Sequence, residues 1–165
     1  PDAMSAAGDI PGAAAELLAA ARARGAIVAT AESCTGGLIG GAITEVPGSS
    51  DIFDRGFITY SNAAKMEMLG IRPETLATHG AVSEEIAAEM AEGALARSNA
   101  TLAVSVTGIA GPGGSEHKPE GRVCFGLAGD GATRTQTVEF GAIGRSNVRR
   151  ATVEHALSLL IAALR

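Results

Sequence analysis

Short apolar runs alternate along the chain with segments of helical period. Residues 26–31 (AIVATA) and 100–108 (ATLAVSVTG) are apolar almost throughout, which is typical of strands covered on both faces of a sheet. Residues 51–60 (DIFDRGFITY) are rich in β-branched and aromatic side chains and predict a third strand. Residues 122–140 alternate between apolar and polar positions around a Gly-Asp-Gly turn, a pattern that predicts a β-hairpin.

Helical segments separate these strands. An early proline, good helix formers and a closing glycine predict a helix over residues 11–24. Ser61 or Asn62 as a cap and Gly70 as a stop predict a short helix, and a capping box opens another over residues 83–98. Two further helices are expected: residues 36–46, closely packed through glycines, and residues 144–165, with Val148, Val153, Ala156, Leu157, Leu160 and Ile161 toward the core. No element is predicted over residues 71–82.

Helices that alternate with buried strands, together with one hairpin, predict an α/β protein. We expect a three-layer α/β/α domain with a mixed β-sheet over residues 11–165, preceded by a disordered extension, residues 1–10. Ligands of such sheets bind beyond the carboxyl ends of the strands. The loops after Ala31, Tyr60 and Thr107 should therefore gather around a site.

Composition narrows the classes of partner. The 165 residues fit one domain, and a net charge of -5 without a run of Lys or Arg argues against nucleic acid and membrane-surface partners. The N-terminal segment lacks the basic and apolar regions of a secretory signal, and no apolar run is long enough to span a bilayer. Two distant cysteines without a CxxC spacing favour a reduced, cytoplasmic setting. The three histidines lack metal-ligand spacing, so we expect no metal.

Three residues that can act as nucleophiles, Ser33, Cys34 and Thr35, lie where the first buried strand gives way to a helix. The N–H groups that begin a helix lack internal partners, so those of Thr35 and Gly36 could stabilise an oxyanion or hold a phosphate. Cys34, Thr35 and Gly36 are accordingly candidate oxyanion or substrate-binding residues. A simple helix cap explains Ser33 or Thr35 as well. The flanking residues do not form Gly-x-Ser-x-Gly, and no Asp–His pair follows in the order a triad needs. Cys34 is intrinsically the better nucleophile, yet a cysteine at an apolar junction is typical of a core.

Lys65 follows Tyr60, the last residue of the third predicted strand, by about one helical turn. An ordinary lysine is neutral for only about one part in a thousand at pH 7.4, but burial lowers the pKa of an amine. A desolvated Lys65 could then take the proton of a serine hydroxyl, with Tyr60 orienting or relaying it. The alternatives are an exposed helix lysine beside a half-buried edge tyrosine, and Ser61 as a nucleophile in place of a cap.

A glycine-rich loop follows the second apolar strand. Its glycines would let a ligand approach the backbone closely, although a flexible turn explains them equally well. The loop is neither a P-loop nor a dinucleotide fingerprint. The candidate binding residues here are Thr107, Gly108, Gly111, Gly113 and Gly114, with Thr107 the expected polar contact.

Four motifs in this order, AESCTGGLIG, GFITYSNAAKMEMLG, THGAVSEEIAAEMAEGA and VSVTGIAGPGGS, closely resemble the CinA C-terminal domain family, whose historical label is competence- or damage-inducible protein. The resemblance extends over about residues 11–164. It implies an α/β/α fold and hydrolysis of nicotinamide mononucleotide to nicotinate mononucleotide and ammonia, without metal or cofactor. It also implies that Ser33 is the nucleophile and that Tyr60 and Lys65 complete the site.

The resulting hypothesis is an amidohydrolase of nicotinamide mononucleotide. Ser33 attacks the carboxamide, Lys65 accepts its proton with help from Tyr60, and N–H groups at the start of the following helix hold the oxyanion. The glycine-rich loop, with Arg145 or Arg149, is expected to hold the phosphate, and the protein is expected to form a homo-oligomer. The alternatives are a non-catalytic module that binds a nucleotide or phospho-metabolite, and an amidase of another small carboxamide.

Overall fold

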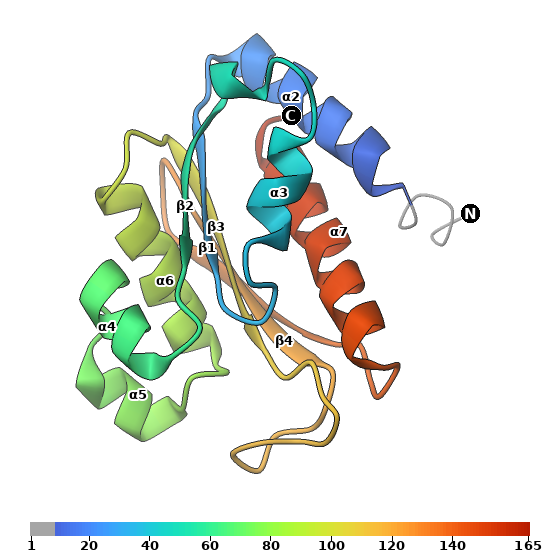
Figure 1. Ribbon diagram of the computed structural model, residues 1–165. Coiled ribbons are helices and arrows are strands. Elements are labelled where there is room, and N and C mark those ends of the chain that lie inside the picture. The colour runs from blue at the N-terminus through green and yellow to red at the C-terminus, as the bar shows by residue number, and fades with distance from the viewer. Residues whose placement is uncertain (1–8) are drawn as a thin grey trace.

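A central sheet lies between two layers of helices in the computed structural model, which describes residues 9–165 (Figure 1). The elements in chain order are α2 (Ile10–Arg24), β1 (Val28–Glu32), α3 (Leu38–Thr44), the 3-10 turn η1 (Ser49–Asp51), β2 (Phe53–Ile58), α4 (Asn62–Leu69), α5 (Pro73–His79), α6 (Glu84–Ala96), β3 (Leu102–Gly108), β4 (Arg122–Ala128), β5 (Arg134–Glu139) and α7 (Arg145–Ala163). Helices α2, α3 and α7 cover one face of the sheet, and α4, α5 and α6 lie on the other (Figure 1). The predicted three-layer α/β/α architecture is confirmed.

The sheet is mixed, as predicted, with the strand order β2-β1-β3-β4-β5. Strands β2, β1 and β3 are parallel, whereas β4 and β5 continue the sheet in antiparallel pairs. The register pairs Glu32, the last residue of β1, with Ile58 of β2 and with Val106 of β3. Strands β1 and β2 therefore end level with each other, and β3 continues for two more residues to Gly108, so the residues that follow the three strands meet at one edge.

Apolar side chains fill both interfaces between sheet and helices. The larger cluster joins α2, α3 and α7 to the sheet and includes the six core-facing residues predicted for the last helix. The second cluster packs α4 and α6 on the opposite face. Small residues bring α6 close to the sheet: a Cβ on Gly126 of β4 would overlap the carbonyl oxygen of Ala87, which accepts a 2.5 Å hydrogen bond from Ser105 Oγ.

Three of the differences between the observed and the predicted elements have a clear physical reason. Helix α5 was not predicted, although Pro73 occupies its first turn and Glu74 adds a negative charge there. Helix α3 begins two residues later than expected because Gly36 and Gly37 adopt left-handed conformations, with φ of 58° and 102°. Asp9 caps α2, so the domain starts before residue 11; the rest of the predicted extension, residues 1–8, lies outside the described residues. Over residues 9–165, no helix has the length and apolar character that a bilayer crossing requires.

Candidate active site

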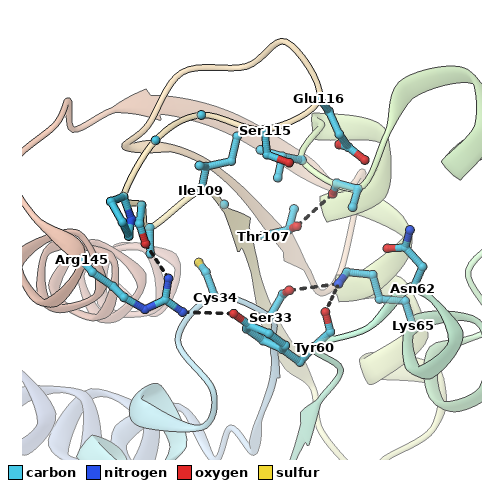
Figure 2. A pocket seen from close by; sticks show the side chains of 18 residues that line it. Ser33, Cys34, Tyr60, Asn62, Lys65, Thr107, Ile109, Ser115, Glu116 and Arg145 are labelled. Carbon is cyan, nitrogen blue, oxygen red and sulfur yellow. Dashed lines mark hydrogen bonds between the residues drawn. The ribbon is translucent and has the colours of Figure 1, made fainter.

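A cavity of about 310 Å³ opens at the edge where β1, β2 and β3 end. The three loops expected to meet there all contribute to its lining, with Ser33, Tyr60 and Thr107 (Figure 2). Lys65 of α4 and Arg145 at the start of α7 also line it, as do the polar residues Asn62, Ser115 and Glu116. This cavity is therefore the candidate site.

Lys65 and Ser33 are brought into direct contact. Lys65 is only 1% exposed, and its Nζ lies 2.9 Å from Ser33 Oγ. The same nitrogen lies 2.9 Å from the carbonyl oxygen of Thr59 and 3.3 Å from that of Tyr60 (Figure 2). The cap of α4 sets this position, because Ser61 Oγ accepts the N–H of Ala64 and starts the helix one turn before Lys65.

Burial favours the neutral form of Lys65, which can accept a proton. Removal of the ammonium from water lowers the pKa of Lys65, and the nearby Cys34 and Glu116 offset part of this by favouring the charged form. A neutral amine has two N–H groups and one lone pair. The two carbonyl oxygens match the two N–H groups, which leaves the lone pair for the hydroxyl of Ser33.

Tyr60 contacts Lys65 through its backbone and not through its phenol. The side chain is 63% exposed, and its hydroxyl accepts a 3.0 Å hydrogen bond from Arg145, which also donates to the carbonyl oxygen of Gly111 at 2.6 Å. Within residues 9–165 the phenol has no hydrogen bond to Ser33 or Lys65. The proton relay that we expected of Tyr60 is therefore absent from this arrangement, because the guanidinium of Arg145 holds the phenol.

Cys34 lies beside Ser33 but remains a neutral thiol. Its side chain is buried in the larger apolar cluster, and burial raises the pKa of Cys34 to about 12, with the charge of Glu32 acting in the same direction. Arg149 donates to the carbonyl oxygens of Cys34 and Thr35, at 3.1 and 3.2 Å. Arg145 lines the cavity and Arg149 does not.

Glu32 is the structural residue that the sequence analysis missed. It is 1% exposed, and its Oε1 accepts from the Thr35 hydroxyl at 2.5 Å and from the N–H groups of Gly37 and Ile39 at 3.2 and 2.9 Å. Its Oε2 accepts the N–H of Gly40 at 2.9 Å. Helix α3 has no side-chain cap of its own, so the carboxylate at the end of β1 caps it across the turn that carries Ser33. Ser33 and Thr35, the caps that the sequence offered, do not fill this role; the available signal was Glu32 itself, a carboxylate at the end of an apolar strand that needs nearby hydrogen-bond donors.

Because Glu32 caps α3, fewer backbone N–H groups of this turn remain free to bind an oxyanion. The N–H of Gly36 donates to the carbonyl oxygen of Ser33 at 3.1 Å, and the side chain of Thr35 is held by Glu32. The expected N–H of Gly36 is therefore engaged, because the left-handed glycine closes a tight turn. The backbone N–H groups of Cys34 and Thr35 have no acceptor in the part of the chain that the structure describes.

The glycine-rich loop lines the cavity with Gly108, Gly111, Gly113 and Gly114. Its donors and acceptors are partly engaged: Glu120 accepts the N–H of Gly113 at 2.8 Å, and Arg145 donates to Gly111. Thr107 is buried and donates to the carbonyl oxygen of Ala81 at 2.8 Å, so its hydroxyl ties the end of β3 to the α5–α6 connection. Among residues 9–165, no group of three or more His, Cys, Asp or Glu side chains could hold a metal ion.

The fold and the buried Ser33–Lys65 pair define an α/β domain with a candidate serine–lysine site. Residues 12–164 match the family model described as the CinA C-terminal domain, and the chain belongs to that family. It is 54% identical over 145 residues to the protein named nicotinamide-nucleotide amidohydrolase PncC from Escherichia coli (strain K12), with 86% of each chain covered. It is 56% identical to a CinA-like protein from Chlorobium phaeobacteroides (strain BS1), of which it spans 35%. The crystal structure of competence/damage inducible protein CihA from Agrobacterium tumefaciens superimposes with a TM-score of 0.92, at 51% identity over 95% of this chain and 96% of that one.

Proposed function

We propose that this protein is an amidohydrolase that converts nicotinamide mononucleotide to nicotinate mononucleotide and ammonia. The observation that carries the proposal is the buried Lys65 Nζ, 2.9 Å from Ser33 Oγ at the edge of a cavity. The identity to the amidohydrolase of Escherichia coli, with most of both chains covered, supports the substrate. A carboxamide is stable in water, so its hydrolysis needs an activated nucleophile, and this pair supplies one.

In the first half of the reaction, neutral Lys65 accepts the hydroxyl proton as Ser33 Oγ attacks the carboxamide carbon. The ammonium that forms keeps its hydrogen bonds to the carbonyl oxygens of Thr59 and Tyr60, which stabilise the new charge. The N–H groups of Cys34 and Thr35 are the donors we assign to the oxyanion, since the next N–H groups along the chain are already bonded.

In the second half, the proton leaves Lys65 for the departing nitrogen, and ammonia is released. An ester now joins Ser33 to the nicotinoyl group. Lys65, neutral again, takes a proton from water as that water attacks the ester, and then returns a proton to Ser33 Oγ. The products are nicotinate mononucleotide and free enzyme.

Arg145 is the residue that we assign to the phosphate. Its guanidinium lines the cavity, and the Tyr60 hydroxyl and the Gly111 carbonyl oxygen fix its orientation. In this scheme Tyr60 assists in two places, with its carbonyl at Lys65 and its phenol at Arg145. Both described cysteines are free thiols, which supports a cytoplasmic enzyme; self-association is a prediction that sedimentation would test.

Incubation of the purified protein with nicotinamide mononucleotide tests the proposal. We expect ammonia and nicotinate mononucleotide in equal amounts from the wild type and none from a folded Ser33→Ala variant. A non-catalytic binding module would saturate with the nucleotide and release no ammonia over hours. An amidase of another small carboxamide would show its activity in a substrate panel and leave the mononucleotide intact.

A further inference from the structure

Glu116 is the only carboxylate among the described residues that line the cavity; the other charged side chains there are Lys65 and Arg145. In the view of Figure 2, Arg145 and Glu116 lie on opposite sides of Ser33. The cavity therefore presents a cation on one side of the nucleophile and an anion on the other.

The backbone that carries Glu116 is held in an unusual conformation. Ser115 and Lys118 exchange two hydrogen bonds, at 3.0 and 2.8 Å, around a two-residue turn. Its central residues, Glu116 and His117, have φ of 52° and 63°, a left-handed combination that usually selects Asn and Gly. A non-glycine residue in this region persists when its surroundings hold it there, and such residues cluster at ligand sites.

The side chain of Lys118 fixes this turn in place. Its Nζ donates to the carbonyl oxygens of His79 and Val82, at 2.7 and 2.5 Å, and so fastens the turn to the connection between α5 and α6. The carboxylate of Glu116 packs beside Gly80 of the same connection, where a Cβ would lie 2.8 Å from its Oε1. Glu116 is exposed to solvent, yet it is presented to the cavity by a fixed segment.

We propose that Glu116 is a specificity-determining residue that recognises the positive charge of the substrate's pyridinium ring. The inference rests on the proposed function. With the phosphate at Arg145 and the carboxamide at Ser33, the ring lies between these two residues, and Glu116 faces it within the same cavity from the far side of Ser33. Glu116 and Lys65 already interact electrostatically across this space, since Glu116 is one of the charges that favour protonated Lys65.

The charge of Glu116 should also make the substrate bind more tightly than the product. Nicotinamide mononucleotide offers Glu116 a cationic ring with a neutral amide, whereas nicotinate mononucleotide offers the same ring with a carboxylate attached. The attraction to the ring and the repulsion from the product's carboxylate then largely cancel. Glu116 thus favours binding of the substrate and release of the product.

Calorimetric titration of the Ser33→Ala protein, which cannot turn the substrate over, tests this. The ligands are nicotinamide mononucleotide and its reduced form, which has a neutral dihydropyridine ring with the same amide, ribose and phosphate. Adding Glu116→Gln should weaken binding of the oxidised nucleotide about 5–10-fold, or about 1–1.4 kcal/mol, and change the reduced one less than about twofold. The difference should shrink at high salt, because Glu116 is exposed.

Glu120→Gln is the matched control. Glu120 is a carboxylate on the same loop that does not line the cavity, and a glutamine oxygen can still accept the N–H of Gly113. This variant should bind both nucleotides as before. An equal effect of Glu116→Gln on the two nucleotides, or no effect, overturns the assignment.

Ammonia release by the wild type separates the two proposals. If the wild type releases ammonia but Glu116→Gln affects binding of the oxidised and reduced nucleotides equally, only the role of Glu116 is contradicted. If Glu116→Gln weakens binding of the oxidised nucleotide alone but the wild type releases no ammonia, the proposed function is wrong and the recognition of a cationic ring by Glu116 still holds.

Discussion

Two substitutions that remove the Glu32 carboxylate, Glu32→Ala and Glu32→Gln, should destabilise the protein to different extents. Glu32→Ala leaves the buried Thr35 hydroxyl and the buried N–H of Ile39 without their acceptor. A buried donor without a partner costs about 1–3 kcal/mol, so we expect a loss of about 2–6 kcal/mol in the free energy of unfolding. The lost interaction between the charge and the start of α3 adds about 0.3–1 kcal/mol.

Glu32→Gln isolates one part of this loss. The glutamine carbonyl can replace Oε1, which serves Thr35, Gly37 and Ile39, but its amide would face the N–H of Gly40 where Oε2 now accepts. One hydrogen bond becomes a contact between two donors, and we expect a loss of about 1–3 kcal/mol.

Urea denaturation gives the free energy of unfolding of each variant. Glu45→Gln is the matched control, because Glu45 is exposed at the other end of α3 and should change stability by less than about 0.5 kcal/mol. A Glu32→Ala variant as stable as this control, or a Glu32→Gln variant less stable than Glu32→Ala, would contradict the capping role of Glu32.

Three further predictions concern the site and the packing. Lys65→Met should abolish ammonia release. In the wild type the rate should rise with pH through the lowered pKa of Lys65, since only the neutral amine accepts a proton; a flat pH profile would contradict this. Between that lowered pKa and about 10.4 the unfolded state binds more protons, so the free energy of unfolding should rise with pH in the wild type and lack this contribution in Lys65→Met. Cys34→Ala should retain activity within about threefold, and iodoacetamide should not inhibit, because burial raises the pKa of the thiol to about 12; inhibition on alkylation would point to a thiol mechanism. Gly93→Ala would drive a Cβ into the carbonyl oxygen of Leu69 and should destabilise by about 1–3 kcal/mol, whereas Gly41→Ala, in open space, should stabilise by about 0.5–1 kcal/mol in the same denaturation assay.

The parts of the molecule that local signals determine were predictable from sequence. The apolar runs and the capping residues indicated the strands and most helices, and the cap at Ser61 places Lys65 one turn into α4. The parallel order of β1, β2 and β3 then brings Lys65 to Ser33, because strand ends meet at one edge. Helix α5 was missed although its proline and glutamate are ordinary start signals, since its seven residues have no buried face.

Contacts between distant segments were not predictable in this way. The phenol of Tyr60 bonds to Arg145, 85 residues later, and nothing near either residue in the sequence indicates the pairing. Glu32 ends a buried strand, where a carboxylate is unexpected, and its role depends on the turn geometry of Gly36 and Gly37. The same geometry decides which backbone N–H groups are free for an oxyanion.

The central claim is that Ser33 becomes covalently acylated, and rapid quench followed by peptide mass spectrometry tests it most directly. The enzyme is mixed with nicotinamide mononucleotide, stopped with acid within one turnover, and digested. We expect the peptide that contains Ser33 to carry the nicotinate mononucleotide group both in the wild type and in Cys34→Ala. An adduct that survives in Ser33→Ala and disappears in Cys34→Ala would contradict it.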